Sequence, residues 1–122
     1  MNNFLYNHQE RLKQLQLKDG STDKDTERTA LFYILAGNDD LYSKVEYIYD
    51  FKERIITPEC LENGKVDFCS SSRKLIKLAY NLFNGYPADV LDTFYILDNN
   101  NFDLALNALK IRFNKHDGTY ID

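Results

Sequence analysis

The 122-residue sequence is poor in the residue types that usually mark a metal site, a disulfide framework or a membrane span. It has no tryptophan, one methionine, two prolines, two cysteines and two histidines. Its longest apolar run, residues 30–36, is far shorter than the roughly 18 residues that a membrane-spanning helix needs. Neither Cys-x-x-Cys nor His-Glu-x-x-His spacing occurs. We therefore expect no membrane span, no bound metal and no cofactor.

The cysteines are Cys60 and Cys69, and the histidines are His8 and His116. The first residues contain neither a basic segment nor a long apolar segment, so we expect no secretory signal and a cytoplasmic location. Two cysteines in such a chain are expected to be free thiols. Because the two histidines lie at opposite ends of the chain, we expect both at solvated surface positions.

The composition is that of one globular domain spanning residues 1–122. Hydrophobic residues make up 43% and charged residues 28%, which is ordinary for such a domain. The net charge of −4 argues against a general nucleic-acid binder. Arg73, Lys74 and Lys77 lie close together, but three bases are too few to favour a DNA-bound regulator. We expect no direct sequence-specific contact with nucleic acid.

The apolar spacing predicts a mostly α-helical fold, a compact single domain of five or six helices. The predicted helices cover residues 7–18, 22–36, 38–49, 70–84, 87–97 and 98–113. The second helix is apolar on all sides, so we expect it at the centre of the domain. Leu41, Val45, Ile48 and Tyr49 form one face of the third helix.

The middle of the chain is less regular. Residues 54–57 and 65–68 are candidate strands, and Asn63-Gly64 favours a turn. Between the strands, Thr57-Pro58-Glu59 is typical of the cap and first turn of a very short helix. A short two-stranded hairpin over about residues 54–68 is one prediction, and an extended loop is the other.

Charge is distributed unevenly along the chain. Residues 37–67 carry eight acids and four bases, residues 68–85 carry three bases and no acid, and residues 86–109 carry four acids and no base. Most charge runs are solvated faces, but an acidic surface also speeds association with a basic partner. The candidate partner-binding residues are Asp39, Asp40, Tyr42, Glu46, Tyr47, Asp50, Asp89 and Asp92.

Tyrosine is favoured at protein interfaces because it combines a large rigid surface with a polar tip. Six tyrosines lie at or beside the apolar stripes of the predicted helices, and most of them are assigned to the core: Tyr42, Tyr47, Tyr49, Tyr80, Tyr86 and Tyr95. Tyr42, Tyr47 and Tyr80 fall off these stripes. We therefore expect these three to be exposed.

A second candidate site lies where the helix of residues 70–84 begins. Ser70, Ser71, Ser72 and Arg73 could hold a phosphate or carboxylate together with the backbone N–H groups of the helix start. Cys69 just before them could have a lowered pKa. The spacing matches neither a tyrosine phosphatase loop nor a glycine-rich phosphate loop. The alternative interpretation is that the serines only cap the helix and the cysteine fills a small apolar space.

Four strings carry a family resemblance: RTALFYILAGNDDLY (residues 28–42), CSSSRKL (69–75), FNGY (83–86) and LD (97–98). Together they resemble a family of small uncharacterised proteins, a domain of unknown function, from Gram-positive bacteria and their phages and mobile elements. No activity comes with the family, so no catalytic residue is carried over. The resemblance implies a small cytoplasmic accessory protein. By analogy, small acidic proteins in that setting bind host factors, and inhibitors of CRISPR nucleases are one such class.

The sequence therefore favours a non-enzymatic, acidic protein-binding module. We expect its partner to have a basic surface, and the specific hypothesis is an anti-CRISPR type of inhibitor that occupies a nucleic-acid groove of a host defence nuclease. The alternative is a phosphate- or nucleotide-binding protein, or an enzyme, that uses the helix start at residues 70–73. The sequence does not indicate an oligomeric state.

Overall fold

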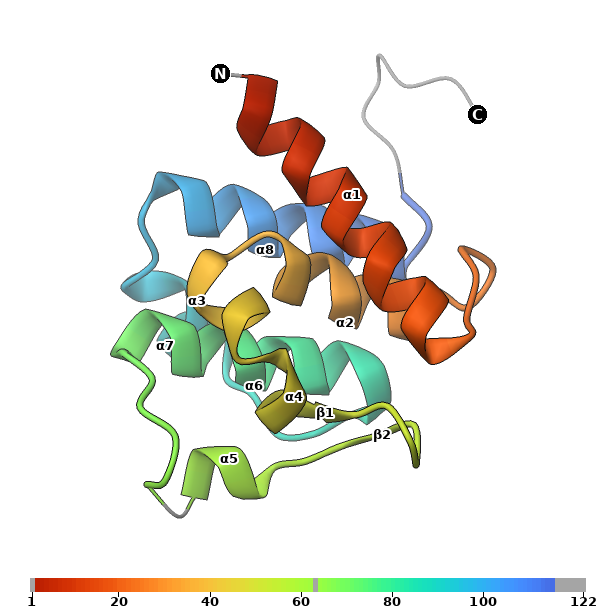
Figure 1. Cartoon of the computed structure of the whole chain (residues 1–122). Coiled ribbons are helices and arrows are strands. Elements are labelled where there is room, and N and C mark those ends of the chain that lie inside the picture. The colour runs from red at the N-terminus through yellow and green to blue at the C-terminus, as the bar shows by residue number, and fades with distance from the viewer. Residues whose placement is uncertain (1, 63, 116–122) are drawn as a thin grey trace.

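The computed structural model describes residues 2–62 and 64–115, with side chains described from residue 7 onward. The elements, labelled in Figure 1, are α1 (Asn2–Asp19), α2 (Thr26–Ala36), α3 (Asp39–Ser43), α4 (Val45–Ile48), β1 (Tyr49–Asp50), β2 (Ile55–Ile56), α5 (Glu59–Glu62), α6 (Ser70–Asn84), α7 (Val90–Tyr95) and α8 (Asn99–Arg112). The described residues are mostly helical and include one antiparallel hairpin, so the predicted fold class is confirmed. Three of these helices, α3, α4 and α5, have only four or five residues, which explains why there are more than the five or six predicted.

Helix α2 forms the centre of the domain, as its all-round apolar sequence predicts. It packs against α1, α6 and α8, and Figure 1 shows it enclosed by these helices. Leu31, Phe32 and Ile34 have no exposed surface. The cap lies three residues later than predicted, because Asp25 and not Thr22 is the N-cap, with a side-chain oxygen that accepts a hydrogen bond from the backbone N–H of Arg28. None of the helices in the described part of the chain is long and apolar enough to cross a membrane.

Cap residues visible in the sequence set the helix ends in the second half of the chain. Gly85 ends α6 with a φ of 86°, a left-handed conformation that glycine adopts without steric cost. Asp89 caps α7 and Asp98 caps α8, each through a side-chain oxygen that accepts a backbone N–H three residues on. The boundaries of α6 and α8 therefore match their predicted ranges closely.

The predicted helix of residues 38–49 is interrupted, although its apolar face is correct. Helix α3 ends at Ser43, Lys44 lies between it and the single turn of α4, and the chain then becomes extended in β1. Leu41, Val45, Ile48 and Tyr49 are all buried, as the stripe predicts. These four side chains are buried although the helix is not continuous. The break directs the Tyr49 side chain towards the buried carboxylate of Asp19.

The hairpin exists, but one of its predicted strands is wrong. Strand β2 pairs with β1, with Tyr49 opposite Ile56 and Asp50 opposite Ile55. Residues 65–68 form no strand, and α5 lies close to the predicted position of the short helix after Thr57. The turn lies at residues 51–54, where Arg54 has a φ of 60°. The apolar pattern located β2 correctly. Its partner is β1, which lies nearer in the chain than residues 65–68, because a shorter loop costs less entropy to close.

His8 corrects the prediction of a solvated histidine. It lies on α1, is 5% exposed, and its Nε2 is 2.9 Å from the carbonyl oxygen of Tyr33 on α2. Burial, the largest cause, lowers the pKa of His8. Gly37 leaves room for the ring, because a Cβ there would lie 2.9 Å from it and 2.3 Å from Leu104. His116 lies outside the described residues.

A buried carboxylate fixes the hairpin to α1 and α2. The side chain of Asp19, at the end of α1, has no exposed surface. It accepts a hydrogen bond of 2.6 Å from the Tyr49 hydroxyl and two of 3.2 Å from the Arg54 guanidinium. Arg28 of α2 donates to the Tyr49 oxygen at 3.1 Å and lies 3.6 Å from Asp19. Burial alone would raise the pKa of Asp19, but these hydrogen bonds outweigh it and lower the pKa.

Candidate protein-interaction surface

The eight residues predicted to bind a partner occupy two parts of the fold. Asp39, Asp40, Tyr42, Glu46, Tyr47 and Asp50 lie on α3, α4 and β1, and Asp89 and Asp92 lie at the start of α7. Both parts contact the first turns of α6. Ser72 donates a hydrogen bond of 3.0 Å to Asp40, and Lys74 pairs with Asp92. The basic helix start that separates two acidic segments in the sequence therefore binds both of them in the folded chain.

Most of the predicted acidic residues are paired within the protein. The ion pairs are Asp39 with Arg11, Asp40 with Lys44, Glu46 with Lys18 and Asp92 with Lys74. Asp50 accepts backbone N–H groups of the hairpin turn at 2.9 Å. Such exposed pairs add little to stability, but each reduces the charge that its carboxylate offers to a partner. The group on α3 and α4 is therefore a weaker acidic surface than the sequence suggests.

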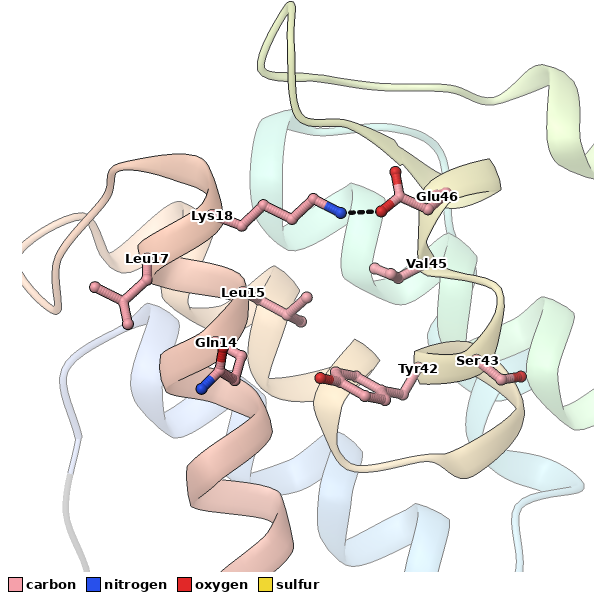
Figure 2. Close-up of a pocket in the computed structure, with 8 residues that line it drawn as sticks. All are labelled: Gln14, Leu15, Leu17, Lys18, Tyr42, Ser43, Val45 and Glu46. Carbon is pink, nitrogen blue, oxygen red and sulfur yellow. Dashed lines mark hydrogen bonds and ion pairs between the residues drawn. The ribbon is translucent and has the colours of Figure 1, made fainter.

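A groove of about 600 Å³ lies between α1 and α3–α4. Figure 2 shows the residues that line it. Lys18 reaches across this groove to Glu46, and Leu15 and Val45 face each other beneath the pair. Tyr42 lies along the groove, and its ring is covered by the guanidinium of Arg11 at 4.6 Å from the ring centre. The ion pair bridges the groove, so a ligand entering it would have to displace internal contacts.

Two of the three tyrosines predicted to be exposed are not fully exposed. Tyr47 is 59% exposed, as predicted, whereas Tyr42 is half-buried under Arg11. Tyr80 is fully buried, and its hydroxyl donates a hydrogen bond of 2.6 Å to the carbonyl of Ile48. The prediction for Tyr80 is wrong because α4 and α5 cover this side of α6, where the Tyr80 hydroxyl contacts Ile48 of α4 and Cys60 of α5.

The predicted anion site at the start of α6 is engaged with groups of the protein itself. Ser72 is buried and donates to Asp40, and Arg73 donates a hydrogen bond of 2.7 Å to the carbonyl of Leu61. Ser70 is exposed and Ser71 is half-buried. A carboxylate already lies beside this helix start, and its charge would repel a second anion. This geometry supports the capping interpretation of the serines more than the ligand-binding one.

The two cysteines are free thiols in different environments. Cys69 is exposed and lies 3.4 Å from the hydroxyls of Ser71 and Ser72. Hydrogen bonds with Ser71 and then Ser72 lower the pKa of Cys69 to about 7. Cys60 is buried, and burial raises its pKa. In the described part of the chain, no group of three or more His, Cys, Asp or Glu side chains is placed to hold a metal ion.

The most exposed apolar surface lies on α7. The sequence predicts Val90, Leu91, Phe94 and Leu97 as the apolar positions of this helix, but only Phe94 and Leu97 pack against the core. Val90 is 73%, Leu91 76% and Tyr95 82% exposed, and Ile96 directly after the helix is 44% exposed. A hollow of about 590 Å³ on this face is lined by Leu91, Tyr95 and Ile96 and by the predicted residues Asp89 and Asp92. We call these six residues, Asp89, Val90, Leu91, Asp92, Tyr95 and Ile96, the α7 face.

A signal for the α7 face is present in the sequence. Between Asp89 and Leu97, only Asp92 and Thr93 are polar, so apolar side chains surround the short helix. In the fold, Thr93 is buried, and Phe94 and Leu97 pack against the core. A six-residue helix that contacts the domain on one side leaves its remaining apolar residues in water.

Comparison with known proteins gives a family without an assigned activity. No curated protein and no solved structure matches the chain. The model of one family, described as a family of unknown function, DUF6075, matches residues 1–120. The resemblance to a domain of unknown function is thereby confirmed over nearly the whole chain. The chain belongs to the family of unknown function DUF6075.

Proposed function

We propose that this protein is a non-enzymatic protein-binding module and that the α7 face is its contact surface. The observation that carries the proposal is the exposure of Val90, Leu91 and Tyr95, each more than 70% accessible to water on a single six-residue helix. Adjacent exposed apolar side chains bounded by polar residues are typical of interaction sites.

The energetics favour association through this face. Full burial of a large apolar side chain stabilises a complex by about 1.5–3 kcal/mol before the costs of association are subtracted. Tyr95 adds a rigid aromatic surface, and aromatic residues are frequent among those that dominate binding energy. Burying Val90, Leu91, Tyr95 and Ile96 in one interface therefore provides a hydrophobic centre for a specific complex.

The charge around the α7 face favours a basic partner. The segment 86–109 has four acids and no base, although Lys74 of α6 neutralises Asp92. Asp89 and Asp98, which flank α7 in the chain, are exposed, and none of the ion pairs formed by the described residues includes them. Positive residues around an apolar contact on the partner would match this pattern and speed encounter.

We further propose a host defence nuclease, such as a CRISPR effector, as the partner. Two considerations support this narrower proposal. Nuclease grooves that hold nucleic acid are basic and suit an acidic ligand. The sequence also resembles proteins of phages and mobile elements, whose small acidic products often act on host defences.

The test measures binding of the purified protein to a panel of CRISPR effectors and other nucleases, together with inhibition of cleavage. The double variant Leu91→Ser/Tyr95→Ser removes the centre of the α7 face. Leu17→Ser is the matched control, because Leu17 on α1 is 77% exposed and Leu91 is 76% exposed. We expect the wild type and the control to bind a panel member and the double variant to lose binding. Absence of any complex, with cleavage unchanged across the panel, would contradict the defence-nuclease proposal.

A further inference from the structure

The hollow on the α7 face combines an apolar wall with two carboxylates. Leu91, Tyr95 and Ile96 supply the apolar side chains, and Asp89 and Asp92 supply the charge. Asp89 is the N-cap of α7 and Asp92 lies in its first turn, and both line the hollow. The hollow therefore suits a side chain with an aliphatic stem and a positive end.

In each carboxylate, one oxygen makes a hydrogen bond or ion pair within the protein, and the other makes none among the described residues. Asp89 Oδ1 accepts the backbone N–H of Asp92 at 2.9 Å, which fixes the orientation of the capping carboxylate. Asp92 Oδ2 pairs with Lys74 of α6. Because Lys74 already neutralises Asp92, Asp89 supplies the uncompensated negative charge of the hollow. Asp89 Oδ2 is the acceptor that remains for a cation of the partner.

We propose that the hollow of the α7 face receives an arginine side chain of the partner protein. The inference rests on the proposed function and specifies the partner's anchor residue. Arginine fits better than lysine because its planar guanidinium donates several hydrogen bonds and also stacks on an aromatic ring. Its stem packs on Leu91 and Ile96, while the guanidinium lies between Tyr95 and the Asp89 carboxylate.

A second copy of this chain is a less suitable occupant. A symmetric contact through the α7 face would bring Asp89 and Asp92 of both copies together. Like charges in an interface disfavour association. Charge complementarity therefore favours a basic partner over self-association. We expect sedimentation velocity to show no dimer that depends on Leu91 and Tyr95. A dimer that this substitution dissociates would overturn the proposal.

The direct test uses three blocked amino-acid amides as probes, followed by ¹H–¹⁵N NMR spectra of the full chain. N-acetyl-arginine amide is compared with N-acetyl-citrulline amide, which has nearly the same shape without charge, and with N-acetyl-norleucine amide, which has only the stem. Each is added to about 10 mM, where weak contacts are populated. We expect the arginine probe to shift the amide signals of residues 89–96 most strongly. Equal shifts from the citrulline probe, or shifts confined to other segments, would overturn the proposal.

Two variants locate the contact. Asp89→Asn removes the charge but keeps an acceptor suited to the cap, so α7 remains capped. This substitution should lower the affinity for the arginine probe about two- to fivefold, as expected for one exposed charge pair, and leave the affinity for the citrulline probe unchanged. Asp103→Asn is the control, because Asp103 is an exposed acid on α8 that does not line the hollow. An equal loss in both variants would indicate a general charge effect and would contradict the proposal.

The outcome separates this inference from the proposed function. If Leu91→Ser/Tyr95→Ser abolishes binding of a protein partner but arginine and citrulline probes behave alike, the protein-binding surface stands and the arginine anchor is wrong. If a partner binds the double variant as tightly as the wild type, the proposed surface itself is wrong, whatever the probes show.

Discussion

Replacing Asp19 with asparagine should destabilise the fold more than any substitution of an exposed carboxylate. Its side chain has no contact with water and is held by Tyr49 and Arg54, with Arg28 at 3.6 Å. Asparagine keeps an acceptor for the Tyr49 hydroxyl but removes the charge opposite two guanidinium groups.

The expected loss in the free energy of unfolding for Asp19→Asn is about 2 kcal/mol. Hydrogen bonds to charged groups contribute about 1.5–3 kcal/mol, and breaking a fully buried pair costs about 3–5 kcal/mol. The value lies below the buried-pair range because the Arg54 side chain is 43% exposed and can regain water. Tyr49→Phe should cost about 1 kcal/mol by removing the hydroxyl that bridges Asp19 and Arg28.

Urea unfolding followed by circular dichroism measures these losses. The matched control is Glu46→Gln, which breaks the exposed pair with Lys18 and should cost less than about 0.5 kcal/mol. Asp19→Asn and Tyr49→Phe should be non-additive when combined, since both act on one hydrogen-bond network. If Asp19→Asn unfolds at the same urea concentration as the control, the buried network does not anchor the hairpin.

The effect of Asp19 should also depend on pH in a defined direction. The folded state lowers the pKa of Asp19 below its ordinary value. Its stabilising contribution is therefore present above the unfolded-state pKa and is lost as the pH falls through the folded-state pKa. The difference in the free energy of unfolding between wild type and Asp19→Asn should therefore become smaller as the pH falls. A difference that widens as the pH falls would contradict the assigned pKa direction.

Three further predictions concern other buried or reactive groups. Because burial lowers the pKa of His8, its neutral form stabilises the fold, and this contribution should be lost as the pH drops from about 7 towards 5; urea unfolding of wild type against His8→Gln at each pH measures it. Gly37→Ala should cost about 1–3 kcal/mol by thermal or urea unfolding, because the added Cβ would lie 2.3 Å from Leu104, and an unchanged stability would show that the side chains move aside. Iodoacetamide at about pH 7 should modify Cys69, whose pKa is about 7, well before buried Cys60, and peptide mass spectrometry that finds equal rates would refute this assignment.

Much of the helical framework could be predicted because local signals and burial agree. The all-round apolar sequence of α2 predicts its central position, and Gly85 and Asp98 mark helix ends through capping chemistry that is local in sequence. The break at Lys44 could not be predicted from the stripe, because the residues of β1 continue the helical periodicity. The break places Tyr49 beside Asp19, a partner 30 residues away that periodicity does not reveal.

The candidate surface was only partly predictable, since charge in sequence does not specify pairing in space. The acids of α3 and α4 and the bases of α1 lie in separate segments, yet Asp39 pairs with Arg11 and Glu46 pairs with Lys18. His8 and Tyr80 were assigned to the surface, but α2 covers the first and several neighbouring elements cover the second. Asp89 and Asp92 were identified from charge, while the exposed apolar residues beside them required the fold.

The most direct test of the α7 face is the dissociation constant of a reconstituted complex. A partner is first captured by wild type and by Leu17→Ser from cells that naturally express the chain, and the complex is then rebuilt from purified proteins. Loss of central interface residues typically costs about 2 kcal/mol or more. We expect Leu91→Ser/Tyr95→Ser to raise the dissociation constant at least about 30-fold and Leu17→Ser to leave it unchanged. Equal dissociation constants for wild type and the double variant would contradict it.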